Sequence, residues 1–120
     1  MIDRLSKYWA INNLTIEQKF EIIIFPYLSF NLIWNDGIAF GLLSFSDEYL
    51  YNILTVFIIL VTTIIFYFLI KAKGIEKYCF MMIFSGSLGN IFDRLFYSAV
   101  PDFIDFHVEN FHWFIFNVAD

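Results

Sequence analysis

The chain has 120 residues, of which 60% are hydrophobic and 22% are aromatic. Soluble domains are roughly 45 to 50% apolar, so this composition indicates one domain that is embedded in a membrane. Twelve acidic residues against seven basic ones give a net charge of −5, and no basic stripe is present to neutralise phosphates, which excludes a nucleic-acid-binding protein. The single cysteine, Cys79, cannot form an internal disulfide, and we expect it to be packed or to face lipid.

Residues 1–13 have a helical pattern without an apolar stretch long enough to span a membrane. Asp3 and Lys7 are four residues apart, which is the spacing of an ion pair within a helix. Tyr8 and Trp9 are residue types that favour the membrane interface. We therefore expect a helix end at the membrane surface.

Residues 20–45 are rich in Ile, Phe, Tyr and Trp, and they are interrupted by Pro26 and by Asn35-Asp36-Gly37. β-Favouring residues around an Asp-Gly signal predict strands joined by a tight turn, with Pro26 on an edge strand or at a bulge. The segment is too interrupted for a spanning helix. We predict a small sheet lying at the membrane surface.

Residues 53–70 form an uncharged run of 18 residues, which is long enough to cross a bilayer. Lys71, Lys73 and Lys77 follow, with Gly74 as a helix stop. Positively charged loops remain on the cytoplasmic side, so the segments before Ile53 and after Arg94 are expected on the outer face.

Residues 78–96 are the second predicted transmembrane segment. Gly86, Gly89, Asn90 and Asp93 share one face of that helix, because they follow the i, i+3, i+4, i+7 spacing. Small residues allow another helix to approach closely, so this face is expected to pack against protein. Residues 97–120 are expected to form an outer loop and the start of a further helix near Phe116.

Four aspartates stand among aromatic and aliphatic residues in the last third of the chain. A carboxylate in lipid costs roughly 2.5 to 3.5 kcal/mol, so such residues suggest function. Two carboxylates that share a site divide into a general acid and a general base, and with a water they can hydrolyse a peptide bond without a metal. Asp93 precedes Arg94 and looks structural, whereas Asp102 and Asp120 end separate segments and are free to converge.

Other catalytic or metal-binding arrangements have weaker support in the sequence. A zinc site is conceivable, but the HExxH spacing is absent and interfacial histidines are commoner; its ligands would be His107, His112, Asp105 and Glu109. GxSxG and Walker-type motifs do not occur. Two further readings are a small non-catalytic accessory membrane protein with aspartates as interfacial caps, and an ion or proton pathway built on Asp93 and Asn90.

Four blocks of sequence, in order, resemble the bacterial lipoprotein signal peptidases, also called signal peptidase II. Asp3 with Lys7 resembles the family's D-x-x-x-K, and NDGIAFG at residues 35–41 resembles N-x-G-x-A-F. GNIFDR at residues 89–94 resembles G-N-x-x-D-R. Asp102-Phe103 and FNVAD at residues 116–120 resemble the two catalytic blocks V-D-F and F-N-x-A-D.

The resemblance implies a mainly α, multi-pass protein of the bacterial inner membrane, with a small extracytoplasmic β-sheet between its first and second helices. It implies an aspartic endopeptidase with Asp102 and Asp120 as the catalytic dyad, working on the extracytoplasmic face without metal or cofactor. The substrates would be prolipoproteins in the membrane lipid, cut before the diacylglyceryl-modified cysteine. A monomer is expected.

The resemblance also assigns supporting roles by position. Asn90, Arg94 and Asn117 would line a polar pocket and support the dyad or the substrate backbone. Asn35 would lie on the sheet that cradles the substrate. Asp3 and Lys7 would hold the end of the first helix near the site. Asp93 and Asp105 are expected to be structural.

Three departures from the family pattern affect these expectations. Family members have four membrane helices, whereas here the first lacks its apolar half before Asp3 and the fourth is missing after Asp120. Pro101 stands where an aliphatic residue usually precedes the aspartate, which would stiffen the loop. We therefore expect a chain clipped at both ends that is inactive or poorly folded by itself.

Overall fold

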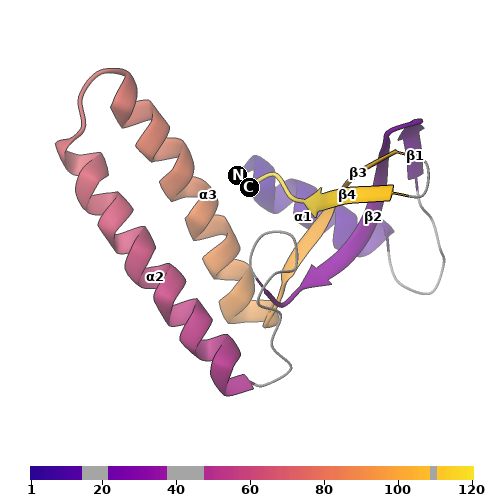
Figure 1. Cartoon of the computed structure of the whole chain (residues 1–120), viewed down its shortest axis with the longest axis horizontal. Coiled ribbons are helices and arrows are strands. Elements are labelled where there is room, and N and C mark those ends of the chain that lie inside the picture. The colour runs from indigo at the N-terminus through magenta and orange to yellow at the C-terminus, as the bar shows by residue number, and fades with distance from the viewer. Residues whose placement is uncertain (15–21, 38–47, 109–110) are drawn as a thin grey trace.

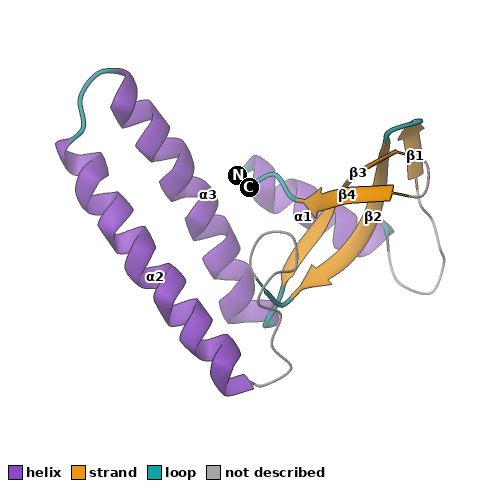
Figure 2. Cartoon of the chain, viewed as in Figure 1, coloured by secondary structure: helices purple, strands orange, loops and turns teal. Residues whose placement is uncertain are grey.

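The computed structural model of the chain describes residues 1–14, 22–37, 48–108 and 111–120 (Figure 1). A pair of long helices stands beside a sheet that is packed on a shorter helix (Figure 2). The elements, in chain order, are α1 (Ile2–Asn13), β1 (Ile22–Phe25), β2 (Leu28–Asn35), α2 (Glu48–Lys71), α3 (Ile75–Tyr97), β3 (Val100–Val108) and β4 (Phe111–Phe116).

Helices α2 and α3 form a hairpin whose two arms contact each other through aromatic side chains. The rings of Phe66 and Phe84 lie 5.1 Å apart between centroids, and a hydrogen bond joins the hydroxyls of Thr62 and Ser87. The connection contains Gly74 at a φ of +58°, a conformation that glycine adopts without steric cost. The hairpin therefore turns close to where the sequence places a helix stop.

Among the described helices, α2 is the one that is long and apolar enough to cross a membrane. Its best window has a mean hydropathy of 2.9, and 17% of that window is buried. A core helix of a soluble protein would be mostly buried, so the exposed apolar surface of α2 fits a lipid-facing helix. Helix α3 covers the second predicted span, but it carries charged residues near both ends, with Glu76 and Lys77 at one and Asp93 and Arg94 at the other.

The strands form one antiparallel sheet in the order β1-β2-β3-β4. A sheet was predicted within residues 20–45, and β1 and β2 lie there. The predicted turn at Asn35-Asp36-Gly37 begins at the last residue of β2, and the strand expected after it stays a prediction. The turn between β1 and β2 lies at Pro26-Tyr27. Proline fits that turn because its φ is fixed and it needs no N–H partner. The rest of the predicted sheet segment, after Gly37, lies outside the described residues.

The outer loop predicted in residues 97–120 is wrong, whereas the helix expected to start near Phe116 stays a prediction. Residues 100–108 and 111–116 are strands, and β3 pairs along β2 with Asp102 opposite Ile33. The sheet is therefore not confined to the segment between the first two helices. Pairing between strands so distant in sequence depends on tertiary context and leaves little local signal. The last four residues form a turn, in which the Asn117 side chain accepts a 2.8 Å hydrogen bond from the Ala119 N–H.

Helix α1 packs against the sheet and lies behind it in Figure 1. Ala10 of α1 and Leu14, the residue that caps this helix, are buried together with Phe103 of β3, and Phe30 of β2 packs against this cluster. The rings of Phe30 and Phe103 meet edge to face at 6.0 Å. This core fixes α1 on the sheet at one end of the molecule.

Candidate active site

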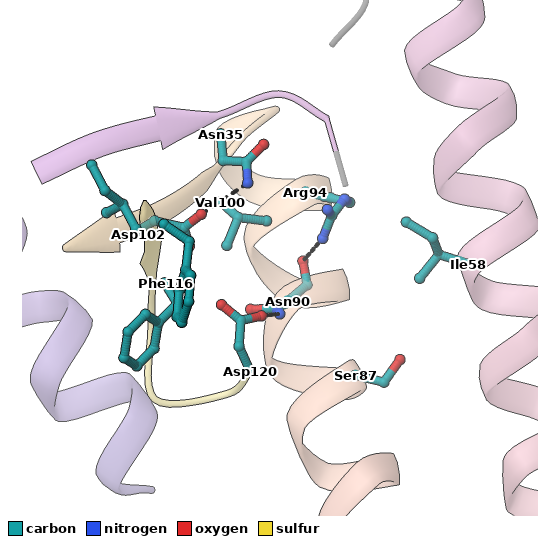
Figure 3. A pocket seen from close by; sticks show the side chains of 11 residues that line it. Asn35, Ile58, Ser87, Asn90, Arg94, Val100, Asp102, Phe116 and Asp120 are labelled. Carbon is teal, nitrogen blue, oxygen red and sulfur yellow. Dashed lines mark hydrogen bonds between the residues drawn. The ribbon is translucent and has the colours of Figure 1, made fainter. Parts of the chain in front are cut away.

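Asp102 lies in β3, beside the point where β4 ends. Phe116, the last residue of β4, pairs with Ile104, two residues short of Asp102. The chain then turns through residues 117–120 and places Asp120 on the side of α3 that carries Asn90 (Figure 3). The two predicted catalytic aspartates thus come from a strand and from a turn, and they line the same cavity.

Asn117 connects the two carboxyl groups directly. Its Nδ2 donates to Oδ1 of Asp102 at 2.7 Å and to Oδ2 of Asp120 at 2.9 Å. One nitrogen atom bridges the two oxygens, and a water molecule with hydrogen bonds of ordinary length would span the same separation. The arrangement therefore has the spacing that a shared water requires.

The amides of Asn35 and Asn117 are oriented by backbone donors. The Oδ1 of Asn35 accepts the Gly37 N–H at 2.9 Å, and the Oδ1 of Asn117 accepts the Ala119 N–H. The NH₂ groups must then face the carboxyl groups, and Asn35 donates to Oδ2 of Asp102 at 2.8 Å. Asp102 consequently receives one amide donor on each oxygen.

A third amide, that of Asn90 in α3, is oriented by a lysine. The Nζ of Lys7 donates to Oδ1 of Asn90 at 2.8 Å, and Nδ2 of Asn90 donates to Oδ1 of Asp120 at 2.7 Å. The ammonium group of Lys7 has hydrogen-bond donors but no acceptor. The amide oxygen of Asn90 therefore faces Lys7, and its NH₂ group faces Asp120. A continuous chain of hydrogen bonds therefore runs from α1 to the aspartate pair.

Lys7 also belongs to a buried ion cluster between α1 and α3. Asp93 is fully buried and accepts from Lys7 at 2.7 Å and from both Nη atoms of Arg4 at 2.5 and 2.9 Å. The predicted pair of Asp3 and Lys7 is present at 3.0 Å. Two cations thus face two anions, which agrees with the structural role expected for Asp93.

Arg4 was not among the predicted site residues. Its position three residues before Lys7 places the two cations on the same face of α1, and that spacing was the available signal. The planar guanidinium matches the two oxygens of Asp93 in a bidentate pair. Arg4 therefore joins Lys7 in holding α1 against α3.

The two glycines of α3 allow the terminal turn to approach the helix. A Cβ on Gly86 would lie 2.0 Å from the backbone oxygen of Ala119, and one on Gly89 would lie 2.9 Å from Oδ2 of Asp3. The sequence predicted a face of α3 for close packing against protein, and the structure places α1 and the Asp120 turn there. Close packing at Gly86 brings Asp120 within reach of Asn90.

Arg94 lines the same cavity and binds the backbone just after the end of β2. It donates to the Gly37 carbonyl at 2.7 Å and to the Asn90 carbonyl at 3.3 Å. Its Nε is buried without a hydrogen-bond partner in the described part of the chain. The cavity measures about 560 Å³ and is lined by Asn35, Ile58, Ser87, Asn90, Arg94, Val100, Asp102, Phe114, Ile115, Phe116 and Asp120 (Figure 3).

Asp102 and Asp120 differ in their surroundings. Asp102 is 4% exposed, and burial raises its pKa above the ordinary value of 3.8, although hydrogen bonds from Asn117 and Asn35 oppose the rise. Asp120 is exposed and accepts from three N–H donors, namely the backbone and side-chain nitrogens of Asn117 and the Asn90 amide. Burial therefore favours the protonated form of Asp102, whereas Asp120 lies exposed among hydrogen-bond donors.

Asp105 is fully buried in β3, opposite Ser29 of β2, and is not one of the described residues that line the cavity. Of the conceivable zinc ligands, Glu109 and the side chain of His112 lie outside the described residues. Within the described part of the chain, no three His, Cys, Asp or Glu side chains are grouped to hold a metal ion.

Two solved structures share this fold, and both are described as bacterial membrane enzymes. One superposes with a TM-score of 0.74 at 29% identity, covering 99% of this chain and 71% of the other. The second has a TM-score of 0.64 at 28% identity, covering 99% of this chain and 76% of the other. The fold and its aspartate-lined cavity therefore place the chain among bacterial membrane enzymes.

The family profile described as Signal peptidase (SPase) II matches residues 1–120. The lipoprotein signal peptidase of Pelagibacter ubique is 44% identical over 120 residues, and the chain spans 72% of that relative's length. The lipoprotein signal peptidase of Rickettsia conorii is 34% identical over 121 residues, and the chain spans 60% of its length. The chain belongs to the signal peptidase II family, a family of peptidases.

Proposed function

We propose that this protein removes signal peptides from prolipoproteins by cleaving before the diacylglyceryl-modified cysteine, with Asp102 and Asp120 as an aspartic dyad. The observation that carries the proposal is the bridge from Asn117 Nδ2 to both carboxyl groups, at 2.7 and 2.9 Å. The bridge sets the two acids at a spacing that one water can occupy. The names of the relatives supply the substrate class.

The environments of the two carboxyl groups support different catalytic roles, one as general acid and the other as general base. Asp102, buried and with a raised pKa, keeps a proton and acts as the general acid. Asp120, whose three partners are all donors, acts as the base that takes a proton from the water. The hydroxide oxygen bonds to the scissile carbonyl carbon while Asp102 protonates the carbonyl oxygen. The C–N bond then breaks as the amine takes the proton that Asp120 holds, and one hydroxyl of the intermediate returns its proton to Asp102 as the carbonyl re-forms.

Arg94 is placed to bind the substrate backbone. Its Nε is a buried donor at the cavity with no hydrogen-bond partner among the described residues, and an unsatisfied donor costs about 1 to 3 kcal/mol until a partner arrives. A carbonyl oxygen of the bound peptide would supply that partner. The aliphatic and aromatic side chains of Ile58 and Phe116 provide the apolar wall of the same cavity.

The orientation of the helical hairpin supports a site on the extracytoplasmic face of the bacterial inner membrane. Lys71 and Lys73 lie at the connection between α2 and α3, whereas Asp93 lies at the opposite end of α3, next to the sheet (Figure 1). Positively charged loops favour the cytoplasm. With α2 and α3 both spanning the bilayer, the sheet and the dyad lie at the outer surface.

The proposal is tested by cleavage of a prolipoprotein peptide in detergent, with and without the diacylglyceryl group. Because the chain spans 72% of the Pelagibacter ubique relative, the assay includes the 120-residue chain and a chimera carrying that relative's two ends. Asp102→Asn and Asp120→Asn should each lower the rate by about 10²-fold or more, since each removes a proton-transfer group. Glu76→Gln, exposed at the far end of α3, is the control.

Dependence of cleavage on the lipid group and on both aspartates supports the proposal. Folded protein that fails to cleave in either form would overturn it, and the aspartates would then be caps in a non-catalytic accessory membrane protein. Retained cleavage in Asp102→Asn would reject the assignment of the dyad.

A further inference from the structure

Arg4 of α1 binds two carboxylates at once. Its Nη1 and Nη2 donate to the two oxygens of Asp93 at 2.5 and 2.9 Å, and its Nη2 and Nε donate to Oδ2 of Asp3 at 2.5 and 2.9 Å. Lys7 forms ion pairs with the same two carboxylates, at 2.7 Å to Asp93 and 3.0 Å to Asp3. Two cations therefore balance two anions between α1 and α3.

The two cations do not share Asp93 equally. Arg4 donates to both oxygens of that carboxylate, whereas Lys7 donates to Oδ2 only. An ammonium group has three N–H donors. Because Arg4 supplies most of the donors that Asp93 needs, an N–H of Lys7 remains for Oδ1 of Asn90, which it reaches at 2.8 Å.

The balance of charge is important because the cluster is buried. Lys7 is 2% exposed and Asp93 is fully buried, and a buried charge without a partner is costly. Without Arg4, one ammonium group would face two carboxylates, and a charged acceptor attracts it more strongly than a neutral amide does. Asn90 would then lose the donor that keeps its amide oxygen turned away from Asp120.

The position of Arg4 separates this effect from direct contact with a substrate. Its Nη2 donates to the Gly89 carbonyl at 3.1 Å, and its guanidinium carbon lies 5.0 Å from the centroid of the Phe92 ring. Arg4 is not among the described residues that line the cavity. Its influence on the reaction must therefore pass through the buried cluster and Asn90.

We propose that Arg4 is a positioning residue for Asp120, because it balances the second carboxylate of the cluster and so leaves Lys7 to orient the Asn90 amide. This inference rests on the proposed function, in which Asp120 is the general base. It assigns the effect of Arg4 to its charge, in addition to its mechanical role in joining α1 to α3. The two roles predict opposite results when Arg4 and one anion are removed together.

The test is cleavage of the diacylglyceryl-modified peptide by the full-length protein, measured as kcat and KM beside the unfolding midpoint in detergent. Arg4→Gln should lower kcat by about tenfold, since the hydrogen bond that orients Asn90 is lost. KM should change little, because Arg4 does not line the cavity. Adding Asp3→Asn to Arg4→Gln leaves one cation facing one anion, and kcat should return close to the wild-type value.

Two further variants complete the series. Lys73→Gln removes an exposed cation at the connection between α2 and α3, and it should change neither kcat nor the unfolding midpoint. Arg4→Lys keeps the charge but loses the planar, two-pronged donor group. It should therefore lower the unfolding midpoint while largely preserving kcat.

Recovery of kcat in the double variant supports the charge role of Arg4. A folded double variant that is as slow as Arg4→Gln, or a folded Arg4→Gln with the wild-type kcat, would overturn it while leaving the proposed cleavage intact. If Arg4→Gln alone does not fold, the double variant decides, since a purely mechanical role predicts no recovery of folding or cleavage. Wild-type protein that does not cleave the peptide would instead remove the proposed function, and this inference with it.

Discussion

The Nζ of Lys7 lies 2.8 Å from the Oδ1 of Asn90, across a sequence separation of 83 residues. This contact decides which end of the Asn90 amide faces Asp120, because an ammonium group has no acceptor. Lys7 of α1 thus sets the hydrogen bonding of Asp120, although its own hydrogen bonds in the described part of the chain go to Asn90 and Asp93.

Replacing Lys7 tests this control. Lys7→Met should lower kcat/KM by about tenfold, because the Asn90 amide can then turn its oxygen toward Asp120. It should also lower the free energy of unfolding by about 3 kcal/mol, since Asp93 loses one of two cations. Peptide cleavage and detergent unfolding measure the two effects. Lys77→Met, exposed on α3, should change neither, and a fully active Lys7→Met would contradict the role of Lys7.

Removing the Asn35 donor should shift the pH dependence of cleavage. The hydrogen bond from Asn35 lowers the pKa of Asp102, so Asn35→Ala should raise that pKa further. The general acid must be protonated, and the alkaline limb of kcat/KM should therefore move to higher pH. Asn12→Ala, an exposed amide on α1, should leave the limb in place. If the alkaline limb of the kcat/KM profile does not move in Asn35→Ala, a group other than Asp102 determines its position.

The raised pKa of Asp102 also makes stability depend on pH. A carboxyl group whose pKa is raised by folding binds more protons in the folded state, so its titration lowers stability as the pH rises from 3.8 through the raised value. Relative to Asp102→Asn, the wild type should therefore lose stability over that window. Thermal midpoints of both proteins, from below pH 3.8 to neutral pH, measure this. If the difference between the two thermal midpoints does not change with pH, the raised pKa of Asp102 would be contradicted.

Gly86→Ala should impair activity although alanine favours helices. The added Cβ would lie 2.0 Å from the Ala119 carbonyl oxygen, so the turn that holds Asp120 must move. Overpacking of about 1 to 3 kcal/mol predicts a loss of about 10- to 100-fold in kcat/KM. Ser85→Ala, at the exposed neighbouring position, should be neutral. Full activity in Gly86→Ala would show that the turn need not contact α3.

Asp93→Asn should destabilise the protein strongly. The change leaves Arg4 and Lys7 without their buried partner, and breaking such a pair costs about 3 to 5 kcal/mol. The unfolding midpoint in detergent measures the loss, and Glu76→Gln serves again as an exposed control. An unchanged midpoint together with altered ion flux would instead favour a pathway through Asp93.

Much of the site could be predicted from sequence because its residues lie in short, ordered blocks. Asp102, Asp120, Asn35, Asn90, Arg94 and Lys7 were all singled out, and the structure joins them through hydrogen bonds or a shared cavity. The apolar run that forms α2 could also be predicted, because hydrophobicity and length are local properties of the sequence. That these aspartates perform the cleavage remains a prediction.

The sequence by itself determined the membrane-type composition, the two long helices and the identity of the clustered polar residues. Only the tertiary structure decided that residues 100–108 and 111–116 are strands, because β3 gains its partner from β2 far earlier in the chain. Only the tertiary structure showed that Arg4 binds Asp93, which is 89 residues away in the sequence. Amide orientation and the fit of Gly86 against Ala119 likewise depend on contacts between distant segments, which no local pattern encodes.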